Sequence, residues 1–177
     1  MIAIIGLLSA FAIPAFNSIG QARGATEAGF QISSAIELAR SEAVGRNTFV
    51  WLGLQPETNL GSRDLRVGLV LSKDGTANQS QANLVPVTGT ILIKQVALVD
   101  SPLGEANFTV GQVIFEESLT FSPLGEVFVN PAPLYDEGFP INLVLEFQQT
   151  RGDTLLTSNT ATIQIDGSTG LPNIVRQ

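Results

Sequence analysis

The chain opens with a run of apolar residues that continues into a regularly spaced apolar stripe. Residues 1–16 contain Ser9 as their one polar side chain, and the first charged residue is Arg23. Small or apolar residues then recur at steps of three or four, which is helical spacing. These positions are Ile19, Ala22, Ala25, Gly29, Ile32, Ile36, Ala39 and Ala43. The pattern predicts one long helix over residues 1–47, apolar in its first half and amphipathic in its second.

Local signals support this helix. Glu37 precedes Arg40 by one turn and Glu42 precedes Arg46, which is the favourable order for ion pairs on an exposed face. Pro14 removes a backbone donor and should bend the helix. Gly45 and Asn47 are stop signals, so we expect the helix to end there.

The apolar segment itself allows more than one interpretation. A helix from Ile2 to Phe16 would rise about 22 Å, less than the roughly 30 Å that about 20 residues provide across a bilayer. Ala10-Phe11-Ala12 fits the small-x-small cleavage pattern of a secretory signal peptide, although no Lys or Arg precedes the apolar run. A signal peptide, however, has no reason to continue into the stripe.

After residue 47 the pattern changes towards the period of two that is typical of strands. Gly, Pro, Asn and Ser indicate loops at residues 55–64 and 72–83. The predicted strands are 48–54, 65–71, 90–99, 113–121, 125–129, 141–147 and 160–165. Strands without intervening helices pair antiparallel. We therefore predict an α+β protein, with the helix packed on an antiparallel β-sheet domain at residues 48–177.

Three further features have structural interpretations. Trp51 is expected to pack between sheet and helix. The pentapeptide Ser-Pro-Leu-Gly-Glu occurs at 101–105 and 122–126, and we interpret both copies as turns. Arg151-Gly152-Asp153 matches an adhesive tripeptide, but a tight turn is expected there.

Composition argues against catalysis. The 177 residues include no cysteine and no histidine, which removes the thiol nucleophile, the usual general base and the commonest zinc ligands. We predict no catalytic, cofactor-binding or metal site, and we do not assign calcium to Asp136 and Glu137. The formal net charge of −7 is concentrated after residue 66, so nucleic-acid binding is disfavoured.

Several motifs resemble one family. Residues 2–16 look like the interior of the N-terminal helix of type IV pilins and type II secretion pseudopilins, including the proline, and residues 34–47 resemble the end of that helix in the GspH/FimT group. Leu119-Thr-Phe-Ser-Pro-Leu-Gly-Glu126 and Thr162-Ile-Gln-Ile-Asp-Gly-Ser-Thr-Gly170 are similar to that group's two late strand-plus-glycine motifs. Some FimT-like proteins take up DNA through a basic C-terminal tail, but residues 171–177 offer only Arg176.

The resemblance implies a non-enzymatic, pilin-like subunit of a pseudopilus or type IV pilus-like filament. It would sit in the inner membrane by a single pass, with its β domain in the periplasm, and contact other subunits through the helix. Family members carry a basic leader, a cleavage glycine, an aromatic residue and a glutamate before the isoleucine-rich stretch. Either the true start lies upstream of Met1, which we expect because the added residues would lengthen the apolar segment to about 20, or the chain is a natural truncation that the peptidase cannot process.

The residues predicted to make functional or structural packing contacts fall in two groups. The packing surface for membrane and filament comprises Ile2, Ile4, Ile5, Gly6, Leu7, Leu8, Phe11, Ile13, Pro14 and Phe16. The helix-to-sheet contacts comprise Ile32, Ile36, Ala39 and Ala43. The alternative function is that of a secreted β-rich binding or surface protein released by a signal peptidase.

Overall fold

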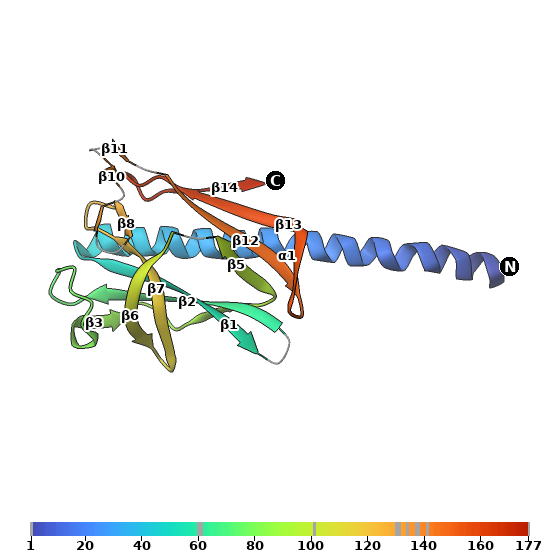
Figure 1. Ribbon diagram of the computed structural model, residues 1–177, viewed down its shortest axis with the longest axis horizontal. Coiled ribbons are helices and arrows are strands. Elements are labelled where there is room, and N and C mark those ends of the chain that lie inside the picture. Colours follow the sequence, from blue (N-terminus) through green and yellow to red (C-terminus); the bar gives the residue numbers. More distant parts are fainter. Residues whose placement is uncertain are drawn as a thin grey trace.

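Among the residues that it describes, a computed structural model shows one long helix, two large antiparallel sheets and a small two-stranded sheet at residues 135–136 and 139–140 (Figure 1). It describes the backbone of residues 2–59, 62–100, 102–129, 132–133, 135–136, 139–140 and 142–176, and the side chains of residues 24–57, 62–100, 102–129, 142–157 and 159–175. The α+β class and the packing of the helix on antiparallel strands are confirmed.

Helix α1 (Ile2–Arg46) ends where the sequence predicted. Asn47 takes a left-handed conformation with φ +52°. The N–H of Asn47 donates to the carbonyl of Val44 at 3.3 Å, and the N–H of Thr48 donates to that of Ala43 at 3.0 Å. This pair of bonds is a Schellman cap, which satisfies carbonyls that the end of a helix leaves free. Arg46 forms the expected ion pair with Glu42 at 2.5 Å.

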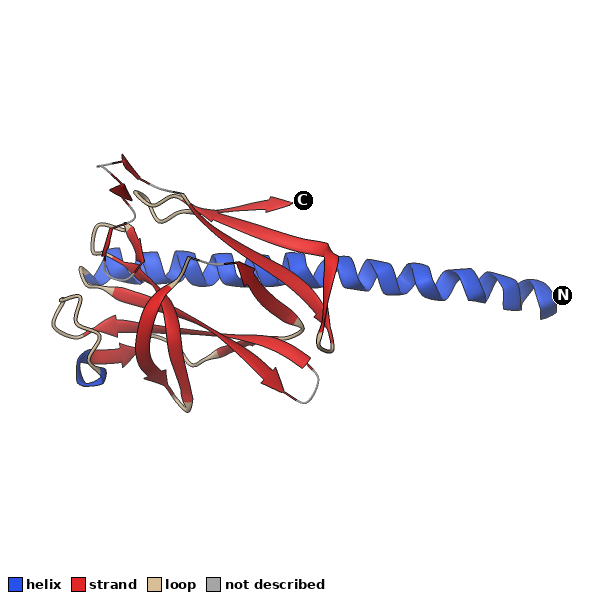
Figure 2. Cartoon of the chain, viewed as in Figure 1, coloured by secondary structure: helices blue, strands red, loops and turns tan. Residues whose placement is uncertain are grey.

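Two sheets enclose the second half of α1. Within the described residues, the larger sheet follows the order β3-β2-β1-β7-β8-β9, with β4 paired to β2 and β6 to β7, and the smaller sheet follows β14-β13-β12-β5. Figure 2 shows the helix running between these sheets and its N-terminal half continuing beyond them. The bounds are β1 (Val50–Asn59), β2 (Ser62–Ser72), β3 (Leu84–Pro86), β4 (Ile91–Ile93), β5 (Val96–Asp100), β6 (Gly104–Val110), β7 (Val113–Phe121), β8 (Val127–Val129), β9 (Ala132–Pro133), β10 (Tyr135–Asp136), β11 (Phe139–Pro140), β12 (Leu143–Arg151), β13 (Thr154–Ile165), β14 (Pro172–Arg176) and the short helix η1 (Gln81–Asn83).

The loop predicted at residues 55–64 is wrong at residues 55–59 and 62–64, which belong to strands. β1 and β2 form one hairpin paired from Val50 and Leu71 to Asn59 and Ser62, so polar residues that favour turns lie inside strands. Glu57 and Arg66, from the two strands, form an ion pair at 2.5 Å. Strands β6 and β14 were also missed, and β13 begins at Thr154, six residues before the predicted start.

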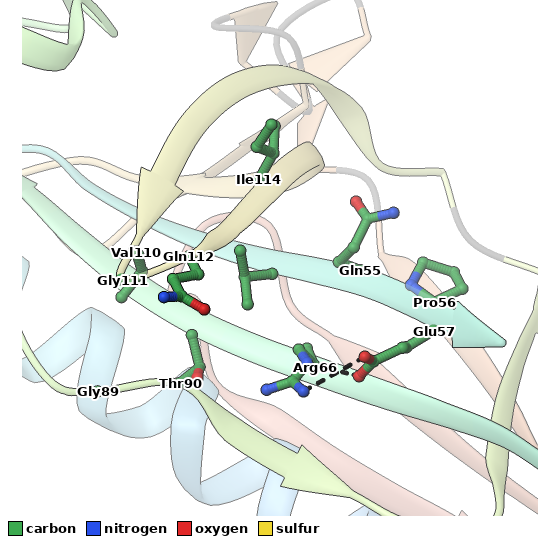
Figure 3. Close-up of a pocket in the computed structure, with 11 residues that line it drawn as sticks. Gln55, Pro56, Glu57, Arg66, Gly89, Thr90, Val110, Gly111, Gln112 and Ile114 are labelled. Carbon is green, nitrogen blue, oxygen red and sulfur yellow. Dashed lines mark hydrogen bonds and ion pairs between the residues drawn. The ribbon is translucent and has the colours of Figure 1, made fainter. Parts of the chain in front are cut away.

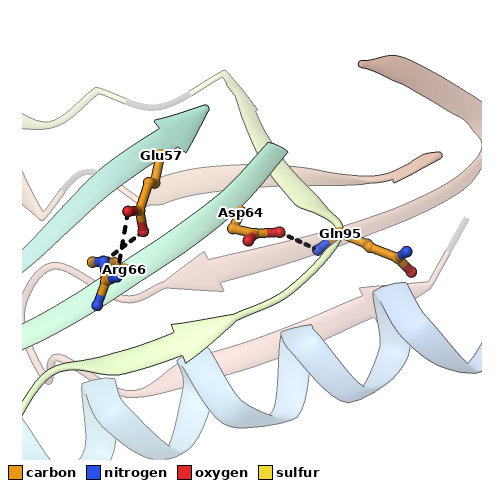
Figure 4. A network of polar contacts seen from close by, with 4 residues as sticks. All are labelled: Glu57, Asp64, Arg66 and Gln95. Atoms are coloured by element: carbon orange, nitrogen blue, oxygen red, sulfur yellow. Dashed lines mark hydrogen bonds and ion pairs between the residues drawn. The ribbon is translucent and has the colours of Figure 1, made fainter. Parts of the chain in front are cut away.

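The single strand predicted at residues 90–99 is two strands in different sheets. β4 pairs with β2 in the larger sheet, whereas β5 pairs with β12 in the smaller one. Gln95 stands between them with φ +57°, which breaks the extended run. Its backbone N–H donates to the carboxylate of Asp64 at 2.9 Å, as Figure 4 shows, and its carbonyl accepts from the N–H of Thr150 at 2.8 Å.

Trp51 lies on the other side of the sheet from the one predicted. Alternate residues of β1, beginning with Val50 and Leu52, face α1 in the main core, while Trp51 belongs to a second cluster with Val70, Phe108 and Phe115. The hairpin of β6 and β7 curls over this outer face and covers it (Figure 1). Both faces of β1 and β2 are therefore buried, and alternation alone could not identify the face that meets the helix.

Candidate functional site

The second half of α1 is built into the core. Ile32, Ile36, Ala39 and Ala43 each have 0% exposure, and they share one cluster with residues of both sheets, including Leu52. Small side chains at Ala39 and Ala43 let the sheets approach the helix closely. Gly29 continues the stripe, and a Cβ added at Gly29 would lie 3.5 Å from the Ala161 side chain.

The predicted membrane and filament residues lie on the first half of the same helix. Ile2 through Phe16 belong to α1. Their side chains lie outside the described residues, so their packing stays a prediction. Within the part of the chain whose side chains are described, no helix is long and apolar enough to cross a membrane.

The two late glycine motifs meet beside the end of α1. In the first, the turn between β7 and β8, the Ser122 hydroxyl accepts from the N–H groups of Leu124 at 3.2 Å and Glu126 at 3.3 Å. The N–H of Gly125 donates to the Ser122 carbonyl at 2.9 Å, and Gly125 has φ +85°. Ser122 is buried, so the hydrogen bonds that stabilise this turn are made to a buried side chain.

The second motif forms the turn between β13 and β14. The Asp166 carboxylate accepts from the Ser168 hydroxyl at 2.6 Å and from the N–H groups of Ser168 at 3.0 Å and Thr169 at 2.9 Å. These donors, the Ser168 hydroxyl first, hold the pKa of Asp166 below its usual 3.8. The turn closes where the N–H of Gly170 donates to the Asp166 carbonyl at 2.7 Å.

Helix α1 contacts both turns. We name the whole contact the glycine junction; it comprises residues 122–126 and 166–170 of the turns, and Arg40 and Val44 of the helix. The Val127 N–H donates to the Gly167 carbonyl at 3.0 Å, which joins the turns. The Arg40 Nε donates to the Thr169 carbonyl. The ion pair predicted between Arg40 and Glu37 is not found among the described residues, because the guanidinium reaches across to the turn.

The junction exposes apolar side chains around its glycines. Leu124 is 79% exposed, and Val44 and Leu171 are about half exposed. An added Cβ at Gly125 would lie 3.2 Å from Val44, so helix and turn are in contact there. Sequence reasoning predicted the turn at residues 122–126 but not its meeting with Arg40, for which neither motif carries a local signal.

The repeated pentapeptide adopts two structures. Residues 122–126 form the turn described above, whereas Gly104 and Glu105 of the first copy already belong to β6. The turn prediction for the first copy is wrong at those two residues. Arg151-Gly152-Asp153 is a tight turn as predicted, since Arg151 pairs with Thr154 and Gly152 has φ +61°.

One open cavity of about 750 Å³ lies between the hairpin of β1 and β2 and the turn joining β6 to β7 (Figure 3). Gln55, Glu57, Arg66 and Gln112 line it, and the ion pair of Arg66 with Glu57 occupies its wall. Among the described residues no group of three or more Asp, Glu, His or Cys could hold a metal ion. Asp136 and Glu137 lie outside the described side chains.

The comparisons with known proteins identify the family. No curated protein sequence and no solved structure matches the chain significantly. A family model described as type II transport protein GspH matches residues 28–135, which include the buried half of α1, β1 to β9 and the first late glycine motif. Because that match covers more than half of the chain, the protein belongs to the GspH family of type II transport proteins.

Proposed function

We propose that this protein is a minor pseudopilin or minor pilin, a structural subunit that enters a type II secretion pseudopilus or a type IV pilus-like filament through the first half of α1. The observation that carries the proposal is the division of one helix. Residues 25–43 bury their stripe between two sheets, whereas the apolar residues 2–16 continue the same helix beyond them (Figure 1).

The apolar residues 2–16 need an apolar surrounding both before and after assembly. Before assembly, the inner membrane would cover them, with the β domain on the periplasmic side. During assembly, the helix would leave lipid and pack against the equivalent helices of other subunits. Such a transfer replaces one apolar environment by another, so close packing at small residues such as Gly6 has to favour the filament.

The family membership and the absence of Cys and His both favour a structural role over an enzymatic one. The alternative, a secreted β-rich binding protein released by signal-peptide cleavage, gives no role to the continuity of α1. Cleavage after Ala12 would cut inside this helix.

The substitution Ile5→Asp tests the proposal. A carboxylate in the apolar segment costs about 3 kcal/mol at the centre of a membrane helix, and it has no partner in a helix bundle. We expect the variant to fold its β domain but to be lost from membranes and from filaments, as measured by membrane fractionation and filament pull-down in the native host.

Ser34→Asp is the matched control, because it adds the same charge to an exposed position of the same helix. The control should assemble normally. Normal assembly of Ile5→Asp would exclude the proposed role of the apolar segment.

A further inference from the structure

The β domain has a distinct face where α1 leaves it. Three segments meet there: the start of β2, the connection from β4 to β5, and the turn between β12 and β13 (Figure 1). The Thr150 hydroxyl donates to the Arg63 carbonyl at 3.2 Å, and the Thr150 N–H donates to the Gln95 carbonyl at 2.8 Å. The helix passes beside them, since an added Cβ at Gly24 would lie 2.6 Å from the Gln149 amide nitrogen.

Each of these segments carries one exposed basic residue, and we name the three together the helix-exit face: Arg63, Lys94 and Arg151. None of the three forms an ion pair with a described residue. Lys94 also lines a cavity of about 270 Å³ with Gly24 and Leu92, directly against α1. The residue before Gly24 in the sequence is a further arginine, Arg23.

Among the exposed side chains named at this face, three are basic and two are acidic. Asp64 is buried and accepts the Gln95 N–H, while Glu27 and Asp153 are exposed. Most other carboxylates lie elsewhere on the domain, for example Glu116 and Glu117 on β7, and the whole chain has a net charge of −7. An anionic surface therefore repels the acidic body of this protein more strongly than the helix-exit face, where exposed basic side chains outnumber exposed acidic ones.

We propose that the helix-exit face binds anionic phospholipid headgroups and thereby holds the β domain against the membrane around the point where α1 enters it. The inference rests on the proposed function, because a helix anchored in the membrane is what brings this face to the headgroups. Arginine and lysine suit the role, since both donate several hydrogen bonds to phosphate oxygens.

The test uses the full chain reconstituted in phosphatidylcholine vesicles with or without phosphatidylglycerol. The chain has no cysteine, so Thr157→Cys, an exposed position on β13, accepts a single fluorescent donor for energy transfer to headgroup-labelled lipid. We expect higher transfer in the anionic vesicles. The difference should vanish near 1 M salt, where the screening length falls to about 3 Å.

In the same labelled background, a triple variant replaces the three basic residues by glutamine: Arg63→Gln, Lys94→Gln and Arg151→Gln. We expect it to reduce the difference in energy transfer between the two kinds of vesicle at least severalfold. Lys73→Gln, an exposed lysine on the loop after β2, is the matched control and should leave it unchanged. Equal transfer in both vesicles, or an equal loss with the control, would overturn the inference. Flotation of the chain with phosphatidylcholine vesicles reports on the helix anchor separately, so failure of the proposed function itself would appear there instead.

Discussion

At the scale of single residues, Gly170 shows why the glycine junction needs glycine. Its φ is +65°, and an added Cβ would overlap the Gly125 carbonyl and approach Val127 to 3.2 Å. Both the backbone conformation and the backbone contact disfavour any other residue. We expect Gly170→Ala to lower the free energy of unfolding by about 1–3 kcal/mol, measured by urea denaturation of the purified protein.

Gly45→Ala is the control for this substitution. An added Cβ at Gly45 meets nothing within 4 Å, and Gly45 lies inside the last turn of α1. Because alanine favours helix more than glycine does, the control should leave stability unchanged or raise it by up to about 1 kcal/mol. A Gly170→Ala protein as stable as this control would mean that the two turns are not in tight contact.

Two turn carboxylates predict a dependence of stability on pH. Bonds from the Thr76 backbone and hydroxyl, Ser72 and Asn83 hold the pKa of Asp74 well below its usual range, and the pKa of Asp166 is lowered from 3.8. A pKa depressed in the folded state contributes stability that is present above 3.8 and is lost as pH falls below it. Stability should therefore decline with acidification below about pH 4.

The variant Asp74→Asn with Asp166→Asn should show a shallower decline than the parent protein in urea titrations between about pH 2 and 5. Asp153→Asn is a suitable control, since Asp153 is exposed in the turn after β12 and accepts no hydrogen bond from a described residue. An unchanged slope in the double variant would show that these turns form equally well with protonated carboxyl groups.

At the scale of elements, α1 depends on the sheets around it. Ile36 has 0% exposure and lies among residues of both sheets, whereas Leu38, two positions on, is 37% exposed. We expect Ile36→Ala to cost about 2–5 kcal/mol, because it removes buried methylene groups and leaves a cavity. Leu38→Ala should cost less than about 1 kcal/mol, so similar unfolding midpoints for the two variants would contradict this packing.

The elements that the sequence predicted correctly are those whose signal is local. The helix stripe, the cap at Asn47, the strand at β7 and the turn at Gly152 each depend on residues close in the chain. The extension of β1 through Pro56 and Glu57 depends instead on pairing with β2, and propensity alone favours a loop there. In the glycine junction, the sequence predicted the turn at residues 122–126, whose signal is local. It did not predict the contact of the turns with Arg40, because that contact depends on topology.

Gly53 and Gly68 show why the place of Trp51 was missed. They are paired on β1 and β2, and an added Cβ at Gly68 would lie 2.5 Å from the Phe115 ring. The two glycines make room for Phe115, which stacks on Phe108 with ring centroids 5.3 Å apart and closes the second cluster around Trp51. No local pattern in β1 indicates that a hairpin about 60 residues later will cover that face.

At the scale of the whole molecule, α1 joins the two sheets into one unit. The main core cluster contains residues of the helix, of the larger sheet such as Leu69, and of the smaller sheet such as Ile163. Opening either sheet would expose the helix stripe, so the sheets should unfold together. We expect native-state hydrogen exchange to show the same opening free energy for the most protected amides of β1, β12 and residues 25–43 of α1.

The variant Ile163→Ala makes this prediction specific. The substitution removes a fully buried side chain from the smaller sheet, at a cost of about 2–5 kcal/mol. If the helix couples the sheets, the global opening free energy of amides in β1 falls by the same amount as that in β12. If instead β12 and β13 lose protection while β1 keeps it, the sheets are separate folding units and α1 remains attached to the larger sheet alone.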